Sequence, residues 1–156
     1  FIRPVKISDE SLLKDFFYSL SDKSIERRFI STRQDMPHER LQNFVIIDYT
    51  KQIVLVAIKG DVDNSYISAV GQYGIDDATH TAEVAFAVRD SEQNNGIGFE
   101  LLKYLTYLAK RQGLLGFTAE VLVENKPMLH VFEKGGFDIK KKIDSGVYEL
   151  TLKFKL

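Results

Sequence analysis

A short polar segment from Gln93 to Phe99 holds the residues whose types and spacing best suit chemistry. A strand-like apolar run ends before it at Val88, and a leucine-rich run at helical spacing begins within it at Ile97. The first backbone N–H groups of a helix have no partner inside the helix, and the helix dipole is positive at that end. Because Gly96 and Gly98 let a ligand approach the backbone closely, the segment predicts a site for a phosphate or diphosphate group.

Two better-defined phosphate motifs are excluded by the residues around these glycines. The dinucleotide-binding fingerprint needs a further glycine at a set spacing, and Phe99 and Leu101 stand near that position. The P-loop needs Gly-Lys-Ser/Thr, whereas this chain continues from Gly98 with Phe99 and Glu100. One alternative stays open at this point, because glycine at a junction between strand and helix often serves packing alone.

The elements that must position this segment follow from hydrophobic periodicity and turn signals. Three apolar runs joined by short turn clusters predict an antiparallel meander, with Val84, Phe86 and Val88 on one face of its last strand. The order of elements predicts an α/β fold of the α+β kind, with one mixed sheet in a single domain over 1–156. We expect strands over about 1–6, 52–59, 66–75, 81–89, 117–123, 137–143 and 147–154, and helices over about 8–20, 22–30, 38–46, 97–112 and 125–134.

Composition and charge exclude several classes of protein. The 156 residues include 21 lysines and arginines and 22 aspartates and glutamates, and the formal net charge of -1 argues against a nucleic-acid-binding protein. Cysteine is absent, and His38, His80 and His130 have no metal-binding spacing, so we expect no disulfide, thiolate nucleophile or metal. No apolar run approaches about 18 residues, which predicts no membrane contact, and nothing in the sequence points outside the cytoplasm.

The segment between Gln93 and Gly98 resembles the acyl-CoA pyrophosphate loop of the GNAT superfamily of N-acyltransferases, and the likeness spans the whole chain. Within that superfamily, segments 82–88 and 117–122 resemble the bacterial Pat-type protein lysine acetyltransferases. The resemblance implies the GNAT fold, with about seven strands, a splayed central pair and four to five helices. It also implies an enzyme that moves an acetyl group from acetyl-CoA to an amine, above all a protein lysine side chain.

The resemblance further implies which residues hold acetyl-CoA. The backbone of Phe86, Ala87 and Val88 would pair with the pantetheine arm, and the Asn125 side chain would contact that arm. The pyrophosphate would lie on the loop, whose residues are Gln93, Asn94, Asn95, Gly96, Ile97, Gly98 and Phe99. In this subgroup the domain is often fused to an acyl-CoA synthetase-like or other module, so we expect a fused upstream domain and an acyl-CoA synthetase as one candidate acceptor.

Glu83 is the general base that the resemblance implies. A lysine amine has a pKa near ~10.4, so at neutral pH it must lose a proton before it can attack a thioester, and a carboxylate can accept that proton. Partial burial beside Ala85 and Ala87 would raise the pKa of Glu83, whereas the alternative is a solvated glutamate on an outward face. Glu120, on a neighbouring strand, is a rival base or a cooperating partner.

Two departures from the superfamily pattern leave other functions open. Phe132 stands where many of these enzymes have a tyrosine general acid, and Asn94 and Asn95 stand where arginine, lysine or glycine is usual. We therefore expect weaker coenzyme A binding. The alternatives are a non-catalytic acyl-CoA-sensing domain of a larger enzyme and a small-amine acetyltransferase.

Three further groups have two interpretations each. Lys140 to Lys142 could meet the 3′-phosphate of coenzyme A or an acidic partner, or could simply protect a solvated strand edge. His130 could face the cofactor groove or lie on the surface. Glu26 to Phe29 could shape the acceptor site or form an ordinary charged helix face.

Overall fold

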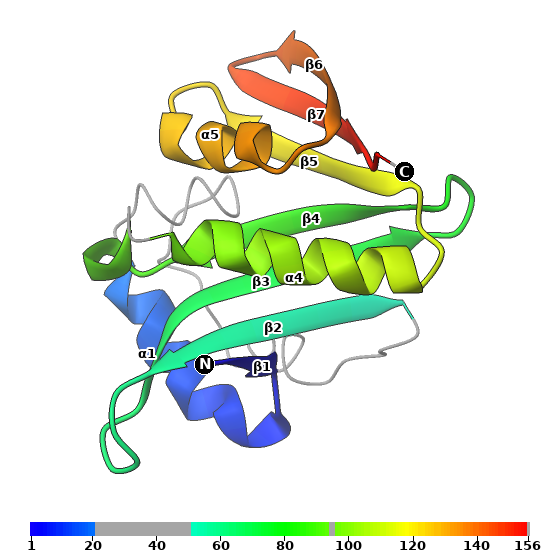
Figure 1. Cartoon of the computed structure of the whole chain (residues 1–156). Helices are drawn as coiled ribbons and strands as arrows, with labels where there is room; N and C mark the ends of the chain where they lie inside the picture. Colours follow the sequence, from blue (N-terminus) through cyan, green and yellow to red (C-terminus); the bar gives the residue numbers. More distant parts are fainter. Residues whose placement is uncertain (21–50, 94–95, 156) are drawn as a thin grey trace.

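A seven-stranded mixed sheet with the order β1-β2-β3-β4-β5-β7-β6 forms the frame of the molecule (Figure 1). The computed structural model describes residues 1–20, 51–93 and 96–155. The predicted helices at 22–30 and 38–46, with Glu26 to Phe29 and His38, lie outside the described residues. The strands are β1 (Ile2–Pro4), β2 (Gln52–Lys59), β3 (Tyr66–Asp76), β4 (Thr81–Val88), β5 (Gly116–Leu122), β6 (Asp138–Asp144) and β7 (Val147–Lys153). The helices are α1 (Glu10–Ser19), α4 (Ile97–Arg111) and α5 (Lys126–Lys134), with 3-10 turns η1 (Ile7–Asp9) and η2 (Asp90–Glu92).

The predicted meander of β2, β3 and β4 is confirmed, and both strand connections are antiparallel. Alternation along β4 sends Val84 and Phe86 into the hydrophobic cluster beneath α4, and Ala87 into the cluster beneath α1. The two helices therefore cover opposite faces of the sheet, as Figure 1 shows for α4 crossing in front of β3 and β4. Glu83 lies on the face that Ala87 shares, opposite to α4.

The sheet opens between β4 and β5. These two strands are parallel and pair at three positions only, the last of which joins Glu83 to Thr118. Beyond that position β5 pairs only with β7, through Leu122. The splayed central pair that the resemblance implies is thus present, and among residues 1–20, 51–93 and 96–155 no strand pairs with this edge of Phe86 to Val88.

Helices α4 and α5 flank this opening, and their ends follow the sequence signals. Gly96, with φ of 87°, precedes α4, and Gly113, with φ of 80°, follows it, so both adopt the left-handed conformation that glycine tolerates. The predicted apolar stripe of α4 is buried against the sheet at Leu101, Leu102, Leu105 and Ala109. Asn125 caps α5, which begins with Pro127 in its first turn.

Asp9 is a buried carboxylate at the start of α1. It precedes α1, but its carboxylate makes no capping bond within that helix. It accepts instead from Arg3 Nη1 at 2.7 Å and Arg3 Nη2 at 2.8 Å, and from the Lys6 backbone N–H at 2.7 Å. Asp9 is 2% exposed, so these bonds satisfy a buried charge that ties β1 to the start of α1.

The C-terminal hairpin places Lys140 to Lys142 on β6, which is an edge strand, and all three are exposed. Lys141 Nζ lies 3.0 Å from Glu133 Oε2 on α5. This location favours the interpretation of a protected strand edge. None of the described helices is long and apolar enough to cross a membrane.

Candidate functional site

A cleft of about 280 Å³ lies between the end of β4, the start of α4 and α5. It brings together all the described residues that the resemblance assigns to the cofactor, from three separate parts of the chain. These are Phe86, Ala87, Val88, Gln93, Gly96, Ile97, Gly98, Phe99 and Asn125. Asn94 and Asn95 lie outside the described residues.

The free edge of β4 turns backbone hydrogen-bonding groups toward the opening. The Arg89 N–H donates to the Ser68 carbonyl on the β3 side at 2.8 Å. Because the N–H and C=O groups of successive residues in a strand point to alternate sides, those of Phe86 and Val88 point away from β3. They face the side where pairing with β5 has already ended, so they are placed to pair with an extended ligand.

The N-terminus of α4 faces the same cleft without a side-chain cap. Gly96 makes no side-chain capping bond, and the Gly98 and Phe99 N–H groups belong to the first turn, where a helix offers them no acceptor. A Cβ added at Gly98 would lie 3.8 Å from Val131 Cγ2 and 4.0 Å from Val88 Cγ2, two residues that line the cleft. Glycine therefore keeps this part of the cleft open and its amides accessible.

Asn125 contributes a buried amide with spare hydrogen-bonding capacity. Its Oδ1 accepts from the Met128 backbone N–H at 3.3 Å, which caps α5. The residue is only 4% exposed and lines the cleft, yet its Nδ2 donor has no hydrogen-bond partner in the described part of the chain. An unpaired buried amide costs free energy, so its position suits a ligand that carries a carbonyl oxygen.

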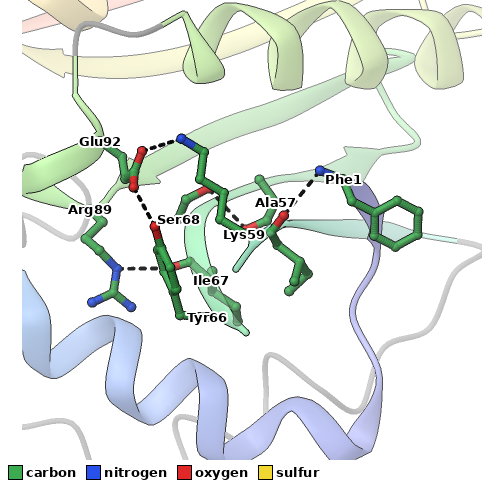
Figure 2. Close-up of polar contacts among 9 residues, drawn as sticks. Phe1, Ala57, Lys59, Tyr66, Ile67, Ser68, Arg89 and Glu92 are labelled. Carbon is green, nitrogen blue, oxygen red and sulfur yellow. Dashed lines mark hydrogen bonds and ion pairs between the residues drawn. The ribbon is translucent and has the colours of Figure 1, made fainter. Parts of the chain in front are cut away.

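The turn before the loop is fixed to the sheet by Glu92. Its carboxylate accepts from Lys59 Nζ at 2.6 Å and from the Tyr66 hydroxyl at 2.8 Å (Figure 2). These bonds to the carboxylate raise the pKa of both Lys59 and Tyr66. Gln93 Nε2 then donates to the Val88 carbonyl at 3.3 Å, which brings the start of the loop back to β4.

Arg89 extends the same contact network toward α1. Its Nε donates to the Ile67 carbonyl at 3.0 Å (Figure 2). Its guanidinium lies over the rings of Tyr66 and Phe16. The sequence analysis missed this network, because nothing in the spacing of Lys59, Tyr66 and Glu92 shows that the three meet.

The two candidate bases share one face of the sheet but differ in position. Glu83 lies at the last paired position of β4 and β5, whereas Glu120 lies two residues beyond Thr118 on β5 and pairs across to Glu149. Glu83 and Glu120 are both exposed. The expected partial burial of Glu83 is therefore wrong: on this face of β4 only Ala87, near the far end of the strand, is buried against α1.

Comparison with known proteins decides the family of this chain. Residues 14–137 match the model of the acetyltransferase (GNAT) family. The chain belongs to this family. Acetyltransferase Pat of Mycolicibacterium smegmatis is 31% identical over 137 residues, which cover 87% of this chain and 40% of that protein. The chain thus spans about two fifths of the length of this curated relative.

Solved structures of GNAT proteins share the fold. The crystal structure of the GNAT domain of S. lividans PAT superposes with a TM-score of 0.87 at 28% identity, covering 98% of this chain and 89% of that one. The yncA acetyltransferase from Salmonella typhimurium, solved with acetyl-CoA, superposes with a TM-score of 0.76 at 18% identity, covering 100% of this chain and 94% of that one. The identity to the second structure supports the fold alone.

Helix α5 supplies four cleft residues of this GNAT domain that the sequence had not indicated. They are Pro127, Met128, Val131 and Lys134. His130 is exposed and also lines the cleft, so both of its interpretations hold in part. The helical spacing of α5 was visible in the sequence, but its packing direction against β4 was not.

Phe132 fills the position where many GNAT enzymes carry a tyrosine. Its side chain is 2% exposed, and its ring lies 5.8 Å from that of Phe86, centroid to centroid. It therefore joins α5 to β4 within the core. Phe132 does not line the cleft and has no proton to donate, so it cannot be a general acid.

Proposed function

We propose that this chain is an N-acetyltransferase that uses acetyl-CoA and acts on an amine, above all a protein lysine side chain. The observation that carries the proposal is that the free edge of β4, the glycine-containing start of α4 and the buried Asn125 amide meet in one cleft. The similarity to acetyltransferase Pat and to the S. lividans PAT domain supports lysine as the acceptor.

The residues of the cleft fit the three chemical parts of acetyl-CoA. The amide groups of a pantetheine arm match the N–H and C=O groups that Phe86 turns away from β3, and Asn125 Nδ2 can donate to one of its carbonyls. The Val88 carbonyl already accepts from Gln93 Nε2. The N–H groups of Gly98 and Phe99, at the positive end of the α4 dipole, suit a diphosphate. Bound acetyl-CoA supplies an activated acetyl thioester.

In the proposed reaction, Glu83 accepts a proton from the acceptor ammonium, directly or through water. The neutral amine then forms a C–N bond with the acetyl carbonyl carbon, and a backbone amide in the Val88 region, at the free edge of β4, would stabilise the resulting oxyanion. The C–S bond breaks, the sulfur leaves as a thiolate, and the remaining extra proton of the attacking nitrogen passes to that thiolate or to water, which leaves a neutral amide. A thiol has a pKa near ~8.5, so this departure is feasible without the acid that Phe132 cannot supply.

The face of the sheet around Glu83 suits a cationic acceptor. Glu83, Glu120 and Glu149 lie on this one face of β4, β5 and β7. Lys142 lies opposite Glu149, so the negative charge that would attract a lysine or a polyamine before deprotonation is that of Glu83 and Glu120. The identity of the acceptor, the fusion to an upstream domain and the cytoplasmic location stay predictions.

A matched pair of variants tests the proposal. Transfer of radiolabelled acetyl from acetyl-CoA to candidate proteins, including an acyl-CoA synthetase, and to polyamines is measured for wild type, Glu83→Gln and Glu120→Gln. We expect Glu83→Gln to lower kcat by about 100-fold or more with an unchanged Kd for coenzyme A, because it removes only the proton acceptor. Glu120→Gln should change kcat by only a few-fold.

Three results would contradict parts of this proposal. Absence of turnover in wild type, with coenzyme A still bound, would favour the acyl-CoA-sensing domain. Transfer to polyamines but to no protein would favour the small-amine acetyltransferase. Full activity of Glu83→Gln would exclude Glu83 as the base.

A further inference from the structure

Two lysines converge on one aromatic ring at the end of the cleft away from Asn125. Lys134 Nζ lies 4.9 Å from the centroid of the Phe99 ring, and Lys103 Nζ lies 5.7 Å from the same centroid. Phe99 is in the first turn of α4, and Lys134 is in the last turn of α5. Phe99 and Lys134 both line the cleft.

This arrangement concentrates positive charge at one end of the cleft. The contacts with Phe99 and the negative C-terminal end of α5 help to hold Lys134 there, beside the first turn of α4, whose dipole is positive. Glu100 Oε1 lies 3.9 Å from Lys103 Nζ, but the side chains are 58% and 60% exposed, so this pair contributes little. Lys134 has no ion-pair partner among the described residues, and no described residue lining the cleft is a carboxylate. The local charge therefore suits a strongly anionic ligand group.

We propose that Lys134 and Lys103 bind the 3′-phosphate of coenzyme A, and this inference rests on the proposed function. A phosphate monoester carries between one and two negative charges at neutral pH, so it gains most from two ammonium groups. Lys134 follows Asn125 by nine residues, which places it roughly 13 Å further along α5. The cleft therefore runs from the pantetheine side, near Asn125, toward the two lysines.

The loop from Gln93 to Phe99 contains no positively charged side chain, and the two lysines would supply the positive charge that it lacks. No arginine or lysine occurs between Gln93 and Phe99, so in that loop the diphosphate must rely on backbone amides. Positive charge for coenzyme A is supplied instead by side chains from α4 and α5. Lys140 to Lys142 do not line the cleft, and Lys141 is paired with Glu133, so they are not this site.

Calorimetry with coenzyme A and 3′-dephospho-coenzyme A tests the assignment. Wild type should bind coenzyme A about tenfold more tightly than 3′-dephospho-coenzyme A, because only coenzyme A carries the phosphate that makes the charge-assisted contact. Lys134→Ala should lose about tenfold in affinity for coenzyme A and less than about twofold for the dephospho form. Lys103→Ala should also weaken the binding of coenzyme A more than that of the dephospho form. Lys134→Arg keeps the positive charge, so its affinity for coenzyme A should stay close to that of wild type.

Lys110→Ala is the matched control. Lys110 is an exposed lysine on α4, seven residues beyond Lys103, where it lies over Phe154. This variant removes the same charge two helical turns away and should leave both affinities unchanged. Thermal unfolding of each variant checks that the fold is intact, and Lys134→Gln provides a second test at that position.

Two outcomes would overturn the inference while leaving the proposed function in place. In one, wild type binds both ligands equally. In the other, Lys134→Ala weakens both ligands by the same factor, which would assign Lys134 to the diphosphate. Absence of any coenzyme A binding in wild type would instead overturn the proposed function itself.

Discussion

At the scale of single residues, the cleft depends on groups that are left without partners. Asn125 uses one end of its amide to cap α5 and keeps the other end for the cleft. Gly96 and Gly98 bring no side chain to the start of α4, where the Gly98 and Phe99 amides have no acceptor within the helix. Each of these features weakens local packing or hydrogen bonding, and a ligand with carbonyl and phosphate oxygens compensates for all of them.

Gly98→Ala tests whether coenzyme A occupies the space beside Gly98 at the start of α4. A methyl group there meets no backbone atom, and alanine favours a helix over glycine by up to about 1 kcal/mol, so the melting temperature should not fall. The methyl would occupy the space beside Val88 and Val131, so we expect coenzyme A affinity to fall by about tenfold in calorimetry.

Gly74→Ala is the control for this prediction. A Cβ at Gly74 has no atom within 4 Å, and the residue lies on β3, outside the cleft. Its coenzyme A affinity should match wild type. Equal affinities of Gly98→Ala and wild type would show that the ligand does not approach this part of α4.

At the scale of elements, buried charges hold the ends of strands and helices in place. Glu92 ties the turn after β4 to Lys59 on β2 and Tyr66 on β3. Asp9 ties the start of α1 to Arg3 on β1. Hydrogen bonds from Arg3 hold the pKa of Asp9 below its ordinary value, so the carboxylate stays ionised although it is buried.

The Arg3–Asp9 pair predicts a pH-dependent stability difference. A carboxyl group with a lowered folded-state pKa stabilises the fold above its unfolded pKa, near ~3.9, and this contribution is lost as pH falls through the folded value. Arg3→Ala should lower the free energy of unfolding by about 3 kcal/mol at pH 7, because it leaves a buried unpaired charge. The difference from wild type should shrink as pH falls below the unfolded pKa and through the lowered folded-state pKa of Asp9, where the carboxylate becomes protonated.

Urea denaturation at pH 7 and at pH 3.5 measures this difference. Lys51→Ala is the control, since Lys51 pairs with Asp77 at 3.7 Å and both side chains are well exposed. That variant should change stability by less than about 1 kcal/mol at either pH. A difference for Arg3→Ala that does not depend on pH would contradict the role assigned to Asp9.

At the scale of the whole molecule, two half-sheets meet at a short parallel junction. β4 and β5 pair at three positions, so packing must hold the halves together. Phe117 on β5 provides this packing, with its ring 5.7 Å from Tyr73 on β3 and 5.0 Å from Phe154 after β7. The cleft opens at the other end of the same junction, where this aromatic contact is absent.

Coenzyme A should therefore stabilise the whole domain by bridging its halves. At a ligand concentration of 100 times Kd, linkage predicts a gain of about 2.7 kcal/mol. For a chain of this size the melting temperature should rise by roughly 5–10 °C. Hydrogen exchange should slow in β4, at the start of α4 and in α5 together.

The protein without ligand and Gly98→Ala with ligand are the controls for this prediction. Gly98→Ala should show a smaller rise in melting temperature than wild type at the same coenzyme A concentration. Slower exchange confined to the start of α4 would indicate that the ligand does not bridge the two halves.

The sequence by itself determined the elements and the chemistry of the loop, because both depend on neighbouring residues. Alternation fixed the faces of β4, helical spacing fixed the stripe of α4, and Gly96 and Gly98 marked the uncapped helix start. Only the tertiary structure decided which distant groups meet. The convergence of Lys134 and Lys103 on Phe99, the anchoring of Glu92 and the exposure of Glu83 depend on how α5 packs and where β5 diverges from β4. These features arise from packing between segments far apart in the chain, and no local pattern of residues encodes them.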